Sequence, residues 1–470
     1  MDRCKHARAP ATRMRSSTTA AAALGIALFA AGASAADGDL DPTFGTGGYT
    51  LTGITGATFQ NPPKPVVLPD GRILVCSVID DGQSGQDFFV ARLDADGALD
   101  TNFDFDGRVT IDFDSRADSC SAIAAQADGK ILLAGSSEDS ATSNSDFAIA
   151  RLNADGSLDP TFGAGTGKTL VPFDVGGSDV DIGDAITVQP DGKILVAGWA
   201  NTDTNGDDFA LVRLLPDGTR DTTFNSTGRV TVGFDLVDSA NRTDQADAVM
   251  IDPNGHILLG GIAEANAAGG FDFALVRLLS NGQLDTNFSA DGRATIAFDF
   301  GASDSDVSYQ SILQRDGKIV MIGAADTGSG DSNFDAAIAR LLPDGSPDPA
   351  FGIGGKVVVP FDLSTNGNDI ALGVVEDSAN RLAVVGVGAY DAMPDFHPVA
   401  LRLLGNGDLD PAFGAFGKKT FDFGATTELF TGVALQGTQI IAGGLVSSGS
   451  DGDNIVARLE VDLVFADGFE

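Results

Sequence analysis

The sequence predicts an all-β protein, a β-propeller of seven four-stranded antiparallel blades. Three signatures carry this prediction: a short hairpin, an apolar strand that ends in Arg-Leu, and a Leu-Asp-x-x-Phe motif or near variant, each present seven times at a period close to sixty residues. After the first 35 residues, no stretch shows a sustained helical period. Four short strands per repeat favour propeller blades, because a closed ring leaves no long sheet edge exposed. An open β-solenoid is the alternative, but its rungs are normally much shorter.

The clearest hairpin spans residues 185–198 and reads Ala-Ile-Thr-Val-Gln-Pro-Asp-Gly-Lys-Ile-Leu-Val-Ala-Gly. Pro and Asp suit the central positions of a type I turn, and Gly suits the left-handed position that follows, so two apolar strands flank a tight turn. The aligned turns are Asp70-Gly71, Asp128-Gly129, Asp191-Gly192, Asn254-Gly255, Asp316-Gly317, Asn380-Arg381 and Gln436-Gly437. In the repeat of residues 184–234, we expect strands at 185–189, 193–197, 209–214 and 221–234.

Each repeat carries an arginine at the end of its third strand. In six repeats this arginine precedes the Asp of the Leu-Asp-x-x-Phe motif by eight residues. The spacing brackets a turn, which brings the two side chains to cross-strand positions where a guanidinium and a carboxylate can pair. A pair repeated in every blade indicates a scaffold feature, and the alternative is a catalytic or ligand-binding charge pair. The six expected pairs are Arg92 with Asp100, Arg151 with Asp159, Arg213 with Asp221, Arg277 with Asp285, Arg340 with Asp348, and Arg402 with Asp410.

The two ends of the repeat region complement each other. Residues 48–52 form a fourth strand with no three strands before it, and residues 432–459 form three strands with no fourth after them. We therefore predict that the N-terminal strand completes the last blade and closes the ring, which removes both open edges. Arg458 has no Asp eight residues later and Asp41 has no Arg eight residues earlier, so these two residues are expected to form the seventh pair.

These motifs resemble the bacterial delta-60 repeat. The matching pieces are Phe-Ala-Leu-Val-Arg-Leu, Asp-Gly, Leu-Asp-x-x-Phe-Gly, Val-Thr-x-x-Phe-Asp and Pro-Asp-Gly-Lys-Ile-Leu-Val-Ala-Gly, and they cover nearly all of the chain after residue 35. The resemblance implies a β-propeller of secreted or surface proteins, and it brings no agreed activity. The sixth and seventh hairpins depart from the pattern, at residues 378–381 and 435–438, which affects the local turn and not the repeat.

The N-terminus has the features of an export signal. A basic region is followed by an apolar run at residues 20–31 and by Ala33-Ser34-Ala35 ahead of Ala36. This run is too short to span a bilayer, and no later segment approaches the length needed. We predict a signal peptide at 1–35, the propeller at 36–460 and a short acidic tail at 461–470. The expected location is the periplasm, the cell surface or the extracellular space.

The charge of the chain limits its partners. The first 35 residues hold five of the 29 Lys and Arg residues and one of the 66 Asp and Glu residues, which leaves a net charge of −41 on the rest. Such an acidic surface disfavours nucleic acid and anionic lipid. We expect a monomer without a membrane span, whose partner is an unidentified protein or surface.

Cysteine and histidine are sparse. After the signal only Cys76 and Cys120 remain, and the hairpin position of Cys76 is Ala in other repeats, which favours buried free thiols over a disulfide without excluding one. Only His256 and His397 remain, and no His-Glu-x-x-His, Gly-x-Ser-x-Gly or phosphate-loop pattern is present. The first strand of each repeat is largely apolar, so no converging acid, base or cofactor site can be assembled. We therefore expect no enzyme and no cofactor.

Acidic residues gather in the long loops that the strand order places on one face. Clustered oxygen ligands suit Ca²⁺, although none of the loops matches a full calcium-binding pattern, and solvated loops are the alternative. The weak Ca²⁺ candidates are Asp179, Asp181, Asp184, Asp203, Asp207, Asp304 and Asp306.

These observations favour a secreted or cell-surface binding or scaffold module with an acidic variable-loop face. Variable loops on a rigid scaffold are where binding specificity usually lies. Two alternatives stay open: a propeller-type enzyme with a metal or cofactor in the central channel, and a structural surface protein.

Overall fold

A computed structural model provides the coordinates. It describes residues 36–54, 57–80, 82, 85–176, 179–202, 206–237, 242–266, 269–298, 305–328, 333–361, 363, 367–389, 396–448 and 451–461. The expected signal peptide, and all of the expected tail except its first residue, lie outside the described residues. The chain divides into the units Met1–Ser34 and Ala35–Glu470, and every strand belongs to the second.

The second unit is all-β, apart from the single 3₁₀ turn η1 (Gly163–Gly165). Within the described residues, antiparallel pairing groups the strands in sets of four. The first strands of these sets are β2 (Thr58–Val67), β6 (Ala117–Ala125), β10 (Asp181–Val188), β14 (Arg242–Ile251), β18 (Asp306–Leu313), β22 (Asp369–Glu376) and β26 (Thr427–Gln436). The second strands are β3 (Ile73–Asp80), β7 (Ile131–Asp139), β11 (Ile194–Thr202), β15 (Ile257–Glu264), β19 (Ile319–Asp326), β23 (Leu382–Ala389) and β27 (Gln439–Ser448).

The third strands are β4 (Gln86–Leu93), β8 (Asn144–Leu152), β12 (Gly206–Leu214), β16 (Phe271–Leu278), β20 (Phe334–Leu341), β24 (Phe396–Leu403) and β28 (Asp451–Leu459). The fourth strands are β5 (Arg108–Ile111), β9 (Lys168–Val171), β13 (Arg229–Val232), β17 (Arg293–Ile296), β21 (Lys356–Val359), β25 (Lys418–Thr420) and, beside β28, β1 (Tyr49–Leu51). Short parallel pairings join β12 to β14 and β24 to β26, so two of the sheets are eight-stranded and three are four-stranded.

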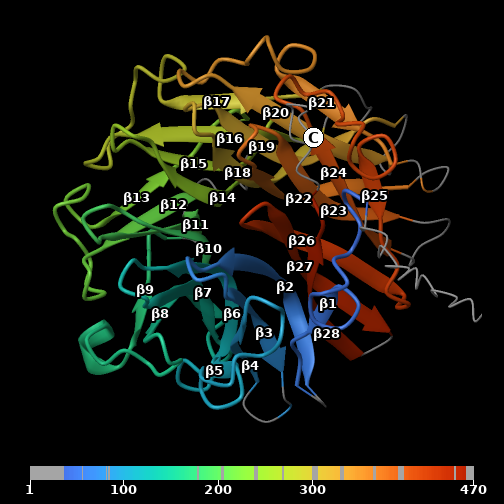
Figure 1. Ribbon diagram of the computed structural model, residues 1–470. Coiled ribbons are helices and arrows are strands. Elements are labelled where there is room, and N and C mark those ends of the chain that lie inside the picture. The colour runs from blue at the N-terminus through green and yellow to red at the C-terminus, as the bar shows by residue number, and fades with distance from the viewer. Residues whose placement is uncertain are drawn as a thin grey trace, which may run out of the picture. The chain divides into compact units, whose positions relative to one another are not determined.

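The sets are arranged like propeller blades. In Figure 1 the first strand of each set lies nearest a common centre, and the other strands follow outward. Apolar side chains pack between neighbouring sets, as in the cluster that joins Leu74 and Phe88 of one set to Ile123 and Leu133 of the next. The fold therefore agrees with the all-β, propeller-type repeat expected from the sequence.

Strand limits differ from the sequence prediction at both ends of the expected strands. The hairpin between β11 and β12 pairs as far as Thr202 with Gly206, so these strands extend into the region expected to be loop. The fourth strand is shorter, because Asp221 and Phe224 form a turn in which the Phe224 amide donates to the Asp221 carbonyl oxygen.

The N-terminal strand lies beside the last strand. β1 pairs antiparallel with β28 in the register Tyr49 with Ala457, Thr50 with Val456 and Leu51 with Ile455. Phe44, Ile73 and Val456 belong to one apolar cluster, which links the N-terminal segment, the first set and the last set. Within the described residues, no helix is long and apolar enough to span a membrane.

Candidate functional site

The repeated arginine and aspartate form ion pairs on the tight-turn face. The Nε atom of each arginine donates to Oδ2 of its partner over 2.6–2.9 Å, and both side chains are mostly buried. In the set that holds Arg151 and Asp159, burial by itself would raise the pKa of Asp159, but hydrogen bonds from Thr161 and Lys130 and the charge of Arg151 lower it. The pairs are Arg92–Asp100, Arg151–Asp159, Arg213–Asp221, Arg277–Asp285, Arg340–Asp348, Arg402–Asp410 and Arg458–Asp41.

The same arginines also reach the neighbouring set. Arg213, for example, donates from its second nitrogen to the Ser280 carbonyl oxygen over 2.7 Å, in the turn between the third and fourth strands of the next set. Arg458 makes the equivalent contact with the Ala95 carbonyl oxygen of the first set, over 2.8 Å. Each of these guanidinium groups is therefore a structural clamp between two sets.

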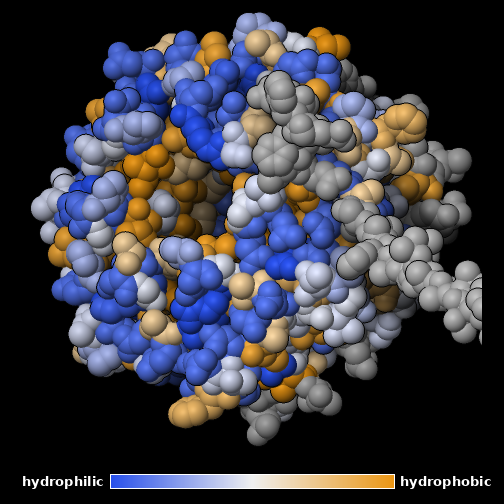
Figure 2. Space-filling model, in the orientation of Figure 1, coloured by the Kyte–Doolittle hydropathy of each residue, from blue (hydrophilic) through white to orange (hydrophobic). Residues whose placement is uncertain are grey.

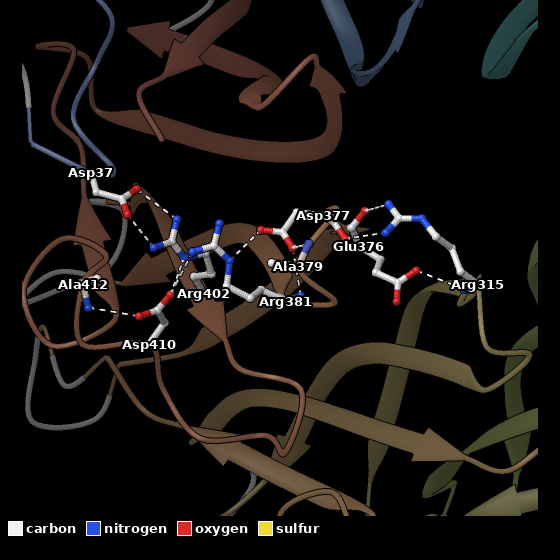
Figure 3. Close-up of polar contacts among 9 residues, drawn as sticks. All are labelled: Asp37, Arg315, Glu376, Asp377, Ala379, Arg381, Arg402, Asp410 and Ala412. Atoms are coloured by element: carbon white, nitrogen blue, oxygen red, sulfur yellow. Dashed lines mark hydrogen bonds and ion pairs between the residues drawn. The ribbon is translucent and has the colours of Figure 1, made fainter. Parts of the chain in front are cut away.

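Figure 3 shows the variant of this clamp near the N-terminus. Arg402 lies between the carboxylates of Asp410 and Asp37, with Asp37 taking the place of a turn carbonyl oxygen. Arg381, from the degenerate sixth hairpin, reaches both Asp377 and Asp410. It thus supplies the second cation that Lys130 or Lys193 provides in other sets.

The expected Ca²⁺ candidates do not form one site. Asp203 and Asp304 lie outside the described residues. Asp179 is exposed, and Asp207 accepts hydrogen bonds from the side-chain amides of Asn201 and Gln245 over 2.8 and 2.9 Å. The three candidates Asp181, Asp184 and Asp306 belong to inner strands and not to loops, and no three of the described candidates share a group of adjacent ligand atoms.

Asp181 and Asp306 belong to a repeated structural device. Each lies at the start of an inner strand, is about 1% exposed, and accepts a hydrogen bond from the amide of the Phe that ends the preceding set. The partners of Asp181 and Asp306 are Phe173 and Phe298, at 2.6 and 2.5 Å. Asp118, Asp244 and Asp369 do the same elsewhere, so these acids cap the connection between successive sets.

The central channel holds a different group of residues. In six sets the pairing of the inner strand with its neighbour shifts by one extra residue, at Ser121, Asp184, Asp247, Tyr309, Leu372 and Thr431. In the first set it shifts by two extra residues between Gln60 and Lys64. A bulge of this kind leaves one residue unpaired and redirects its side chain. The inner strands lie nearest a common centre, where Figure 2 shows the surface hollowed, and charge interactions place the bulged residues Asp184 and Asp247 near each other and near Lys64.

Charge interactions link residues of several inner strands. Burial raises the pKa of Asp184 to about 7, Lys64 lowers it, Asp247 raises it further, and a hydrogen bond from Ser121 lowers it. Burial raises the pKa of Asp247 to about 6, while Lys64 and the Ser308 hydroxyl lower it. These groups come from the inner strands of separate sets.

Two further features mark the channel as a chemical site. Neither carboxylate oxygen of Asp247 is reached by solvent or by a hydrogen bond of standard geometry among the described residues. Burial, and then Asp247, raises the pKa of Tyr309, which keeps this partly exposed phenol protonated as a donor. No ion pair within 4.0 Å joins Lys64 to either carboxylate in the described part of the chain, so the ammonium and the carboxylates are near but not in contact.

The sequence analysis missed this group because it took each inner strand as an apolar run. The expected strand 185–189 begins one residue after Asp184, and the residue that the bulge redirects was left outside it. The sequence does contain a pattern that could have revealed this group. The position before the apolar run is occupied in successive repeats by Ser121, Asp184, Asp247 and Tyr309. Different polar residues at one position of an otherwise uniform repeat indicate a functional site.

The remaining residues considered from the sequence are placed as follows. Nδ1 of His256 lies 2.7 Å from Asp252 within one turn, and Nδ1 of His397 lies 3.7 Å from Glu428. Cys76 and Cys120 are buried free thiols in one apolar cluster.

Comparison with protein families supports the fold. Residues 68–103, 126–162, 189–224, 253–288 and 314–351 match the family described as "Domain of unknown function (DUF5122) beta-propeller". Each matched segment ends at the Phe of the Leu-Asp-x-x-Phe motif or its variant. The matches are consistent with a β-propeller repeat family, and a search of curated proteins found no relative.

Solved structures with a similar fold include both uncharacterised proteins and enzymes. A protein of unknown function from Dyadobacter fermentans is 13% identical over 88% of this chain and 100% of its own, with a TM-score of 0.42. The polysaccharide lyase Uly1 is 9% identical over 89% of this chain and 92% of its own, with a TM-score of 0.45. A Trypanosoma rangeli sialidase in complex with the inhibitor DANA is 12% identical over 85% of this chain and 55% of its own, with a TM-score of 0.39.

At these identities and TM-scores, no substrate or activity passes from these proteins to this chain. The prediction that the chain is not an enzyme is corrected to this extent: the similar solved structures include a lyase, a sialidase, an arabinanase and a glucose dehydrogenase, so this kind of fold does not exclude an enzyme. The argument from a largely apolar first strand also needs correction, since Asp184, Asp247 and Tyr309 are polar residues within the inner strands.

Proposed function

We propose that this chain is an exported bacterial β-propeller of the delta-60 type, with seven blades closed into a ring by β1. The pairing of β1 with β28 and the contact of Arg458 with the first set support closure. The ring is the scaffold, and its central channel holds the functional site.

The site is an acid–base site for a small polar molecule. The single observation that carries this proposal is that Lys64, Asp184 and Asp247, each on the inner strand of a different set, interact through their charges. General acids and bases work best with pKa values near the operating pH, and clefts that combine burial with charge partners are where enzymes produce such values. Scaffold ion pairs such as Arg213–Asp221 have the opposite character, because there the pKa of Asp221 is lowered.

Each residue has a distinct role in this proposal. Asp184 and Asp247 act as an acid–base pair, in which one carboxyl holds a proton while the other is ionised near neutral pH. Lys64 holds an anionic or hydroxyl group of the ligand between the two carboxylates, and Tyr309 donates a hydrogen bond. Two carboxylates, an ammonium and a phenol suit a hydroxyl-rich ligand such as a sugar or sugar acid, so the reaction class is proton transfer to or from such a molecule.

The test is a thermal-shift screen of neutral monosaccharides, uronic acids and their p-nitrophenyl glycosides between pH 5 and pH 8. We expect a compound of this panel to raise the melting temperature of the wild-type protein at millimolar concentration, and the rise to be lost in Asp247→Asn and Lys64→Met. Asp128→Asn on the exposed tight-turn face is the matched control and keeps the rise. Any turnover should follow a bell-shaped pH profile bounded near the two carboxyl pKa values.

A binding module with an acidic loop face is the competing function. It rests on Asp179, Asp174 and Asp235 at the outer loops. If a ligand of the panel binds equally well to wild type and to Asp247→Asn, and exchange of Asp174 and Asp235 for Asn abolishes binding, the loop face is the site and the channel proposal fails.

A further inference from the structure

A groove follows β25, the outermost strand of the sixth set, on the side away from the channel (Figure 1). Two adjoining cavities of about 490 and 640 Å³ form it, and Leu363 and Thr420 lie in the walls of both. All three residues of β25 line the smaller cavity. Because successive side chains of a strand point to opposite faces of the sheet, a cavity lined by three successive residues wraps the free edge of the strand.

This edge is open for main-chain pairing. β25 pairs with β24 on one side, and no strand within the described residues pairs with its other side. The Phe421 amide donates across to the Pro398 carbonyl oxygen of β24. Since alternate residues of a strand hydrogen-bond to alternate sides, the N–H and C=O of Thr420 point to the open edge. Such an edge is a template for an extended segment that adds to the sheet.

Two lysines distinguish β25 from the other outer strands. Lys418 Nζ donates to the Pro360 carbonyl oxygen of the preceding set, whereas Lys419 Nζ contacts the Asp39 carboxylate of the N-terminal segment. The side chain of Lys419 stays 31% exposed. At its position the other fourth strands carry Thr50, Val109, Thr169, Val230, Ala294 and Val357. The second ammonium is therefore specific to the sixth set.

Apolar side chains complete the groove. Phe361 and Leu363 line it, and Phe416 is 84% exposed in the turn that leads into β25, next to the wall residue Ala415. Large apolar side chains exposed beside a groove are typical of a surface that another segment covers. Together with the lysines, they suit an extended segment that is both apolar and acidic.

The end of the described chain lies beside this groove. The Glu460 amide donates to the carbonyl oxygen of Asp39, a wall residue, over 2.8 Å. Val461 packs against the apolar cluster that contains Phe421, another wall residue. Residues 462–470 follow in the sequence and read Asp-Leu-Val-Phe-Ala-Asp-Gly-Phe-Glu, with three acids, four successive apolar residues and no proline. An extended segment of this length reaches about 30 Å, at roughly 3.3 Å per residue.

We propose that residues 462–470 dock in the groove of their own chain as an added strand along β25. The main chain of the segment pairs with the open edge at Thr420. Its apolar residues 463–466 cover Leu363 and Phe416, and its acids complement Lys419. Docking covers an edge that would otherwise be open to a second chain. The proposal is independent of the channel chemistry.

The first experiment measures hydrogen exchange in the full chain by mass spectrometry with fragmentation to single residues. Wild type is compared with a tail variant that combines Leu463→Asp and Phe465→Asp. We expect the Thr420 amide to exchange at least about tenfold more slowly in wild type, because a segment on a short tether has an effective concentration in the millimolar range. Thr231 holds the equivalent position of β13 and is the internal control, so its exchange should be equal in both proteins.

The second experiment uses a fluorescent synthetic peptide of residues 462–470 and follows its binding by anisotropy. We expect it to bind the tail variant at least about tenfold more tightly than wild type, in which the tethered segment occupies the groove. Adding Lys419→Glu to the tail variant should weaken peptide binding, and Lys419→Gln tests the charge alone should Lys419→Glu disturb the contact with Asp39. Thr169→Glu introduces the same acid at the equivalent position of β9 and is the matched control that leaves binding unchanged.

Four results would overturn the proposal. Equal exchange of Thr420 in wild type and the tail variant would mean that the segment does not dock there. Equal peptide binding to both would mean that the groove is open to a partner from another protein. Protection of Thr420 that disappears on dilution, together with a dimer in size-exclusion chromatography, would assign the groove to the segment of a second copy. Equal weakening by Lys419→Glu and Thr169→Glu would place the peptide elsewhere. Asp247→Asn in the channel should leave Thr420 exchange unchanged, so the two proposals fail separately.

Discussion

Nε of Arg458 donates to Oδ2 of Asp41 over 2.6 Å, across 417 positions of the sequence. The arginine is 7% exposed and the aspartate 1% exposed, so the pair is shielded from water. Asp41 also accepts hydrogen bonds from the Thr43 amide and hydroxyl. This pair joins the N-terminal segment to the last strand in the geometry that the other sets use within themselves.

Replacing Arg458 by Ala should destabilise the protein by about 1–3 kcal/mol, because it strands the buried Asp41 carboxylate and removes the bond to Ala95 of the first set. Urea unfolding monitored by circular dichroism measures the loss. The exposed Arg220→Ala is the control and should stay within about 0.5 kcal/mol of wild type. Equal losses for both variants would remove the distinction between clamping and surface arginines.

Above pH 5 the protein should become less stable as the pH rises. Burial raises the pKa of Asp118, Asp181, Asp244 and Asp247 to about 6 and that of Asp184 to about 7. Between pH 4 and pH 7 the folded state therefore binds more protons than the unfolded state, so the free energy of unfolding falls as the pH rises through this range. We expect a loss of at least about 2 kcal/mol between pH 5 and pH 8, since one pKa unit on one group is worth about 1.4 kcal/mol.

Below pH 4 the scaffold pairs reverse this trend. The pKa values of Asp41, Asp100, Asp221 and Asp348 are lowered, against the effect of burial, by hydrogen bonds and by arginine. The stability they provide is present above the ordinary Asp pKa and is lost as the pH falls through their folded values. Urea unfolding between pH 3 and pH 8 should thus give a maximum near pH 4–5, and a steady rise from pH 5 to pH 8 would contradict the assignment.

The variant Asp247→Asn isolates the channel contribution. It removes a buried carboxylate that has no hydrogen bond of standard geometry among the described residues. We expect it to be more stable than wild type at pH 8, by at most about 3 kcal/mol, and by roughly half as much at pH 5, where the wild-type carboxyl must still take up a proton on folding; the difference should vanish only below about pH 4. Chemical unfolding at the two pH values makes the comparison, and Asp128→Asn should show no such pH-dependent difference.

Two glycines test the packing between sets. Gly218 and Gly255 both have positive φ, of +86° and +83°, so Ala at either position carries a similar backbone strain of about 1 kcal/mol. A Cβ on Gly218 would lie 2.7 Å from the buried ring of Phe162 in the preceding set, whereas a Cβ on Gly255 has nothing within 4 Å. Gly218→Ala should therefore lose about 1–3 kcal/mol more than Gly255→Ala in thermal or urea unfolding. Equal losses would mean that the ring moves aside without cost.

The repeat made much of this fold predictable. The Asp-Gly turns, the Arg-Leu strands and the eight-residue spacing of Arg213 and Asp221 are local patterns, and local patterns repeated along a chain specify strand order and pairing. The pairing of Tyr49 with Ala457 follows from the same logic, because an unmatched strand at one end needs the unmatched edge at the other.

The residues proposed for the channel site could not be predicted from the repeat in the same way. Asp184 and Asp247 reach the channel through a one-residue shift in pairing, and a shift of one residue moves a side chain to the opposite face of a sheet. The burial of Asp181 likewise depends on the amide of Phe173, at a position where the sequence shows only an acid in a polar region. Both outcomes depend on tertiary contacts that a linear pattern does not contain.

The last prediction concerns Cys76 and Cys120, which are 2% and 1% exposed and lie in one apolar cluster between the first two sets. Burial, together with the neighbouring Cys76 thiol, raises the pKa of Cys120 well above its usual value. The thiolate is the reactive form, and a raised pKa and burial both suppress it. We expect neither thiol to react with an aromatic disulfide reagent in the folded protein at pH 8, and both to react after unfolding in guanidinium without reductant. An added exposed thiol, Ser115→Cys, should react at once in the folded protein and shows that the reagent is active. Rapid native reaction of Cys76 or Cys120 would contradict their burial, and unfolded protein without free thiols at these two positions would show that the pair is oxidised, contrary to the free thiols of the structure.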